Sequence, residues 1–223
     1  MAHQKKIQAS GAPDATAGAT KRGEDTRERI LSAAIEEFCA AGFAGASTTR
    51  IVQAANCNIR MLYHFFAKKD GLYRAALERV YEQLRDSEDR ISFWQRPPRE
   101  GVAELTTFTF DYMLENPQFP KMVLQENLAG GDMARELGSL YSRSRPLIAN
   151  LDGLIENGFA DGTFCKRPSA TDLYLTILSL SFIHISNLHT LTATFGEDLT
   201  EAAFLERRRA HAVEVVLGYL GAD

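Results

Sequence analysis

The side chains best suited to chemistry in this 223-residue chain lie between residues 48 and 73, and they suit contact with a nucleic acid duplex. Residues 58–66 combine Asn, Arg, Tyr and His with apolar side chains, and the basic pair Lys68 and Lys69 follows. Arginine and histidine can reach base edges, apolar groups can contact thymine methyls, and lysines can pair with phosphates. The segment therefore has the composition of a base-reading helix next to a phosphate contact.

Two short helices and a tight turn must position these groups. Ser47 or Thr48 can cap the first helix, because a side-chain oxygen there accepts free amide protons of the first turn. Asn56 tolerates the left-handed backbone that a sharp turn requires, and Asn58 can cap the second helix. The second helix can anchor to a core through Leu62, Phe65 and Phe66. This layout predicts a helix-turn-helix, whose second helix enters the major groove.

From Asp25 to about Tyr73 the chain resembles the DNA-binding domain of the TetR family of bacterial regulators. The resemblance is carried by TRERILSAAIEEFCAAGF, TTRIVQAANCN and LYHFF, followed by Lys69, Asp70 and Leu72 at the start of a fourth helix. Two positions depart from the family pattern. Asn56 stands where the family usually has glycine, and Lys68 stands where it usually has a Ser, Asp or Asn cap.

The resemblance implies a set of DNA-contacting residues. Arg60 and His64 are expected at base edges or nearby phosphates, with Ile59 and Met61 against thymine methyls. The expected phosphate contacts are Thr48, Thr49, Tyr63, Lys68 and Lys69, with Asn58 in either role and Arg50 on the same surface. The alternative for each is an ordinary exposed helix residue, and for Thr48 a pure cap.

The charge distribution agrees with a DNA-binding N-terminal end. The formal net charge is −4, but residues 1–74 carry 11 Lys or Arg and 7 Asp or Glu, a net charge of +4. We expect a flexible basic tail at residues 1–22, because it has almost no large apolar residues. A helix-turn-helix domain at 23–73 and a second domain at 74–223 are expected to follow. No secretory signal pattern precedes them, so a cytoplasmic location is expected.

The remainder reads as an all-α bundle without an alternating strand pattern. The expected helices begin near Asp25 and then span 70–88, 99–115, 120–128, 133–157, 170–193 and 197–220. Leu173–Leu191 has 19 residues without formal charge, the length of a membrane span, but eight are Thr, Ser, His or Asn. We therefore predict a buried helix and no membrane contact. The cysteines Cys39, Cys57 and Cys165 are expected to be free buried thiols.

In the resembled family the last two helices of each chain form a homodimer interface, and the C-terminal bundle holds a small-molecule effector. The fragment FPKMVLQENLAGG looks like the middle helix of one subgroup that binds small metabolites. The candidate ligand-binding residues are Phe108, Met113, Met122, Gln125, Glu126, Phe182 and His184. Core packing is the alternative for each of them. The mixture suits a partly polar aromatic or heterocyclic effector.

The predicted function is a ligand-responsive regulator, most simply a repressor that binds a pseudo-palindromic double-stranded operator as a homodimer and is released by an inducer. An activator, or a regulator without a ligand, is the alternative within this class. A helical protein-interaction module that does not bind DNA is the alternative outside it. The five histidines show no nucleophile, metal or carboxylate constellation, so no enzyme activity, cofactor or metal is expected.

Overall fold

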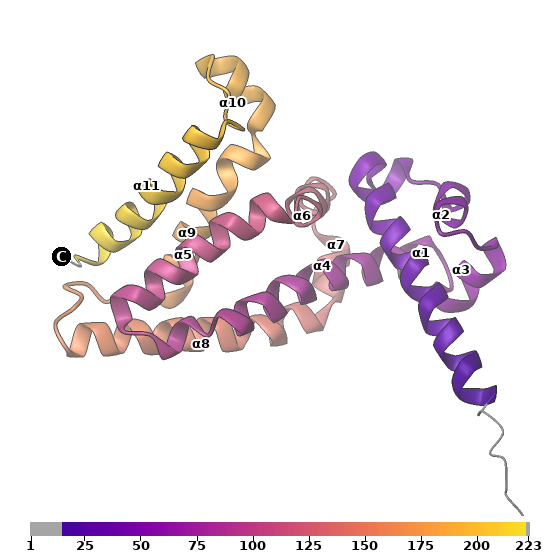
Figure 1. The fold of residues 1–223 in the computed structure, drawn as a ribbon, viewed down its shortest axis with the longest axis horizontal. Helices are drawn as coiled ribbons and strands as arrows, with labels where there is room; N and C mark the ends of the chain where they lie inside the picture. The colour runs from indigo at the N-terminus through magenta and orange to yellow at the C-terminus, as the bar shows by residue number, and fades with distance from the viewer. Residues whose placement is uncertain (1–14, 222–223) are drawn as a thin grey trace, which may run out of the picture.

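The computed structural model describes residues 15–221, and all regular elements in that range are helical (Figure 1). The N-terminal unit consists of α1 (Ala15–Gly45), α2 (Thr48–Ala54) and α3 (Ile59–Phe66), followed by the long α4 (Lys69–Ile91). The remaining elements are η1 (Phe93–Gln95), α5 (Pro98–Glu115), α6 (Gln118–Leu128), α7 (Asp132–Glu136), α8 (Gly138–Ala160), α9 (Ala170–Ser186), α10 (Leu188–Phe195) and α11 (Ala202–Leu220). The predicted all-α class, with a helix-turn-helix before a larger helical domain, is confirmed.

The first helix starts earlier than the sequence suggested. Residues 1–14 of the predicted tail lie outside the described residues. Residues 15–22 belong to α1, so the predicted helix start near Asp25 was wrong. Alanine at positions 15, 17 and 19 has the highest helix propensity, which allows the helix to extend before its apolar face begins.

Two other helices predicted as continuous are interrupted. The backbone leaves the helical conformation at Asn187 (φ −116°, ψ 22°), which separates α9 from α10 within the expected helix 170–193. The Asn187 side chain donates to the Ser186 hydroxyl at 2.7 Å, and such local bonds compete with the helical ladder. Similarly, Leu137 separates α7 from α8 within the expected helix 133–157.

Two apolar clusters hold the molecule together. The first runs from the N-terminal unit into α5 and α6 and includes Ile30, Phe38, Leu62, Leu72 and Met122. The second joins η1, α5, α8, α9 and α11 and includes Phe93, Leu105, Leu151, Ile177 and Val216. The predicted domain boundary between residues 73 and 74 falls inside α4, which extends from one unit to the other (Figure 1).

The surface elements follow from this packing. In Figure 1, α2 and α3 lie at the outer edge of the N-terminal unit, away from α5 and α8–α11. Among the described residues, no helix has the length and hydropathy needed to cross a bilayer.

All three cysteines are free, but only Cys39 and Cys57 are half-buried; Cys165 is exposed, which corrects the expectation of a buried thiol. Cys165 lies in the loop before α9, where its amide, and not its side chain, bonds to the Leu220 carbonyl at 2.9 Å.

Candidate nucleic-acid interface and ligand cavity

The caps that define the helix-turn-helix are formed by the predicted residues. The Ser47 hydroxyl accepts from the Arg50 amide at 3.4 Å at the start of α2, and the Asn58 carbonyl oxygen accepts from the Met61 amide at 3.1 Å at the start of α3. Asn56 has the left-handed φ of 48° expected at the turn. Lys68 precedes α4 and provides no side-chain cap. The orientation of α3 is therefore fixed by short-range contacts.

The face of α3 opposite its anchor is open. Leu62 is fully buried and Phe66 is 6% exposed, whereas Ile59 and Tyr63 are 37% and 47% exposed. The exposed side of the helix carries Ile59, Arg60, Tyr63 and His64, and Met61 is half-buried. Arg60 makes no hydrogen bond or ion pair with any residue in the part of the chain that the structure describes. Its guanidinium is thus available for an external acceptor.

The two lysines after α3 have different environments. Lys68 is 64% exposed in its side chain and forms an ion pair with Asp70 at 2.8 Å. Lys69 is half-buried; its ammonium donates to the Ala46 carbonyl at 2.6 Å and lies 5.0 Å from the centre of the Phe43 ring. Lys69 therefore tethers the connection between α1 and α2 as well as contributing charge. Of the two, Lys68 is the more accessible to a phosphate.

The N-terminal end of α2 presents a similar mixture. Thr49 is exposed and Thr48 is half-buried next to the capping residue. Arg50 is exposed, but its Nε donates to the Glu37 carboxylate at 2.9 Å, and it also donates to the Gly45 carbonyl at 2.9 Å. The hydrogen bond from Arg50 lowers the pKa of Glu37, so the pair remains charged at neutral pH. Arg50 thus has a structural partner that the sequence did not reveal.

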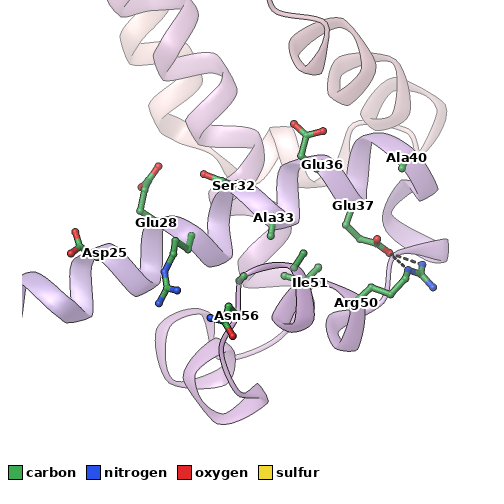
Figure 2. Close-up of a pocket in the computed structure, with 13 residues that line it drawn as sticks. Asp25, Glu28, Ser32, Ala33, Glu36, Glu37, Ala40, Arg50, Ile51 and Asn56 are labelled. Atoms are coloured by element: carbon green, nitrogen blue, oxygen red, sulfur yellow. Dashed lines mark hydrogen bonds and ion pairs between the residues drawn. The ribbon is translucent and has the colours of Figure 1, made fainter.

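A groove of about 1030 Å³ lies between α1 and α2 (Figure 2). Figure 2 shows Glu37 pointing at Arg50, whereas Asp25, Glu28 and Glu36 lie at the rim, on the side of α1 turned away from α2. The lining holds four carboxylates and the two guanidinium groups of Arg29 and Arg50, so its net charge does not favour a phosphate backbone. The open face of α3 and the exposed Lys68 are better placed for DNA.

A smaller cavity of about 250 Å³ lies among α4, α5, α6 and α9 in the C-terminal part. It brings together only two of the seven predicted ligand residues, Met113 and Phe182. The sequence missed the other residues that line it: Tyr81, Leu84, Arg85, Phe119, Val123, Leu175, Leu178 and Ser179. Arg85 is the only charged residue in this lining. The available signal was spacing, because Glu88 continues the buried stripe of Leu77, Val80 and Leu84 along α4.

The other predicted ligand residues have packing roles instead. Met122 is fully buried in the first apolar cluster, and Phe108 is half-buried with its ring 5.6 Å from that of Tyr112. The Gln125 amide donates to the Cys39 carbonyl on α1 at 3.2 Å. The Glu126 carboxylate accepts from the Ala134 amide at 2.9 Å. None of these four lines the cavity.

His184 lies on the other side of α9 from the cavity. It is 3% exposed, its ring stacks on Phe110 at 4.8 Å, and neither ring nitrogen has a hydrogen-bond partner in the structure. Burial, together with the nearby Arg208, lowers the pKa of His184 to about 4. The imidazole is therefore neutral at physiological pH and behaves as part of the apolar packing.

Arg85 belongs to a buried polar group behind the cavity wall. It forms an ion pair with Glu88 at 2.7 Å and donates to the Tyr174 hydroxyl at 3.3 Å. The Tyr174 hydroxyl in turn donates to the other Glu88 oxygen at 2.8 Å. Burial raises the pKa of Glu88 to about 7 in spite of the adjacent guanidinium. No group of three or more potential metal ligands occurs among the described residues.

Comparison with known families covers both parts of the chain. Residues 30–76 match the family model described as bacterial regulatory proteins, tetR family. Residues 98–216 match the model described as the tetracyclin repressor-like C-terminal domain. The two matches coincide with the helix-turn-helix and with the helical bundle that contains the cavity.

Individual proteins give the same result. The chain is 33% identical over 181 residues to the HTH-type transcriptional repressor NicS of Pseudomonas putida, covering 81% of this chain and 85% of that protein. It is 36% identical over 169 residues to the repressor SCO4008 of Streptomyces coelicolor, covering 73% and 80%. Among solved structures, the regulator SCO4942 of S. coelicolor superposes with a TM-score of 0.67 at 23% identity, covering 89% of this chain and 99% of that one. FadR of Bacillus subtilis, solved with stearoyl-CoA, gives 0.65 at 12% identity, covering 85% and 97%.

Proposed function

This chain belongs to the TetR family of bacterial transcriptional regulators, and from that premise we propose that it is a repressor that binds a pseudo-palindromic operator as a homodimer and is released by a small-molecule inducer. Residues 23–73 would read the DNA, and residues 74–223 would hold the effector and the dimer interface. The names of two relatives, NicS and SCO4008, include the word repressor, which supports this choice over activation. An operator of this kind lies in the cytoplasm, and the proposed role includes no catalytic step.

The observation that carries the proposal is the free outer face of α3. Arg60 and His64 are exposed there without an internal ion pair, next to the apolar Ile59 and the amphipathic Tyr63. Such a mixture suits the major groove, where guanine offers two acceptors and thymine offers a methyl group. A single helix of eight residues contacts few base pairs, so two copies must act together on adjacent half-sites.

Exposed apolar side chains on α9 and α11 support a dimer through the last long helices. Leu175 and Ile183 on α9 are 54% and 45% exposed, and Val215 and Tyr219 on α11 are 37% and 46% exposed. Apolar residues exposed on two adjacent helices favour burial against a second copy. The two α3 helices would then lie roughly 34–36 Å apart, or a multiple of one DNA turn.

α6 connects the cavity with the DNA-binding unit and provides a route for induction. Phe119 and Val123 of α6 line the cavity, while Gln125 of the same helix donates to Cys39 of α1. The Cys39 thiol contacts the Gln118 carbonyl at 3.6 Å. A ligand that favours a different position of α6 would therefore shift α1 and change the spacing of the α3 helices. Induction requires the ligand to bind one of the two arrangements more tightly than the other.

Selection of bound DNA duplexes from a pool of random sequences tests the proposal. We expect it to recover a motif made of two half-sites related by two-fold symmetry. On that motif, Arg60→Ala should weaken binding by about 1–3 kcal/mol and relax the preference at one position of each half-site. Arg90→Ala, which changes an exposed arginine on α4 in the C-terminal part, is the matched control and should bind as the original protein does. Recovery of no enriched sequence would contradict the proposed function and favour a protein-interaction module.

A further inference from the structure

The cavity among α4, α5, α6 and α9 has the chemistry of a selective site. Its walls are mostly apolar and aromatic, including Leu84, Met113, Phe119 and Phe182, and Arg85 contributes the only charge in the lining. At about 250 Å³ it lies just below the roughly 300–1,000 Å³ typical of sites for drug-sized molecules. This volume favours a compact occupant over a long acyl chain.

Arg85 has unused hydrogen-bonding capacity at this wall. The residue is 9% exposed, and its Nε has no hydrogen-bond partner in the structure. A buried donor without a partner is unfavourable, and an acceptor on a ligand that reached it would remove that cost. Guanidinium groups carry five N–H donors and can bind two carboxylates at once, so the ion pair with Glu88 does not use up its capacity.

The charge on Arg85 is also incompletely neutralised. Burial raises the pKa of Glu88 to about 7, because the effect of burial exceeds that of Arg85 and the Tyr174 hydroxyl, and Asp89 on the same helix adds to the shift. Glu88 therefore balances the guanidinium less fully than it would in an exposed ion pair, and an anion that enters the cavity would be attracted to Arg85.

We propose that this cavity binds a small organic carboxylate, with its carboxylate on Arg85 and a body about the size of one ring between Met113, Phe119 and Phe182. This inference rests on the proposed function, since it names the chemical class of the inducer. It also narrows the partly polar aromatic effector that the sequence suggested to an anionic one. The apolar walls supply contact area, and the arginine discriminates between an acid and its neutral analogue.

The test compares benzoate with benzamide, which has the same shape without the charge, and with decanoate. Thermal shift and calorimetry on the full chain should show stabilisation by benzoate and hydroxybenzoates, with at least tenfold weaker binding of benzamide and no binding of decanoate in the cavity. In the double variant Arg85→Met/Glu88→Gln, which removes both charges and leaves no unpaired ion, benzoate should lose its advantage over benzamide. Arg143→Met, which removes an arginine that pairs with Glu82 and Asp86 outside the cavity, is the matched control and should keep the preference.

A second variant keeps the proposal testable if the double variant does not fold. Val123→Phe leaves Arg85 in place but fills the cavity, so it should block benzoate while the helical circular dichroism is retained. Equal binding of benzoate and benzamide, a preference for decanoate, or no stabilisation by any carboxylate would overturn the inference. Operator binding is measured separately on the ligand-free protein. If it is present while the acid and the amide behave alike, only this inference fails; if it is absent, the proposed function fails.

Discussion

At the scale of single residues, the two adjacent lysines after α3 have different roles: Lys69 stabilises the fold, and Lys68 presents an accessible charge. Lys69 donates to the Ala46 carbonyl and lies over the Phe43 ring, whereas Lys68 is mostly exposed. Lys69→Met should therefore lower the free energy of unfolding by about 1–2 kcal/mol, because it removes a charged hydrogen bond and a cation–π contact. Chemical denaturation of the variant and the original protein measures this difference.

Lys68→Met is the matched comparison. Its ion pair with Asp70 is exposed, and such pairs contribute little to stability. We expect unchanged unfolding, but weaker binding to all DNA sequences and a salt dependence flatter by about one unit in slope. If Lys68→Met destabilised the protein and Lys69→Met did not, the assignment of the two roles would be reversed.

His184 makes the stability depend on pH. Its folded-state pKa of about 4 lies below the value of 6.5 for an unperturbed histidine, so the unfolded chain binds more protons between these two values. The contribution of neutral His184 to the free energy of unfolding is present above pH 6.5 and is lost as the pH falls toward 4. Between pH 7 and pH 5 the loss is about 2 kcal/mol. Urea unfolding of His184→Phe should lack this loss at a matched protomer concentration.

The exposed His189 on α10 provides the control for that measurement. His189→Phe should follow the original protein at both pH values. If His184→Phe loses as much stability on acidification as the original protein does, another group is responsible.

At the scale of elements, the junction between α3 and α4 is under backbone strain. Ala67 has φ 58° and ψ −50°, the strained conformation of a γ-turn, which costs an L-residue about 1–3 kcal/mol. The chain is close-packed here, because a Cβ atom on Gly71 would collide with the Phe66 carbonyl. Ala67→Gly should therefore raise the free energy of unfolding by about 1 kcal/mol, as measured by denaturant titration.

The same substitution in a regular helix should have the opposite sign. Ala149→Gly changes an exposed residue in the interior of α8 and should destabilise by about 1 kcal/mol. A loss of stability in both variants would mean that the unfolded-state entropy of glycine outweighs the strain at Ala67.

The helix-turn-helix could be predicted from the sequence because its determinants are local. The caps at Ser47 and Asn58 and the left-handed Asn56 act within a few residues, and each takes the predicted conformation. The break at Asn187 could not be predicted, because an uncharged run of apolar and small polar residues continues through it and a single asparagine decides the outcome. The cavity was largely missed for a different reason. Its lining comes from four helices, so neither Arg85 nor Val123 stands out until the chain is folded.

At the scale of the whole molecule, one continuous chain of contacts links the predicted DNA-reading and effector-binding parts. α4 extends through both, and α6 packs on α1 while it lines the cavity. Arg79 on α4 pairs with Glu28 on α1, and Arg74 pairs with Glu136 on α7, so charged as well as apolar contacts join these elements. Energetic coupling through such contacts requires two discrete arrangements of the same elements.

The proposed dimer determines how tightly the whole molecule can hold an operator. Two linked helix-turn-helix domains bind DNA with an affinity that exceeds that of one domain by a factor of about 10²–10⁴. Ile183→Asp places a charge on the exposed apolar face of α9, where two copies would meet and repel each other, so we expect monomers in analytical ultracentrifugation and at least about 100-fold weaker operator binding. Tyr141→Asp, at a 74% exposed residue on α8, is the control and should leave a dimer. If Tyr141→Asp separates the subunits and Ile183→Asp does not, the interface lies on α8, and the spacing of the two α3 helices must be derived from that face instead.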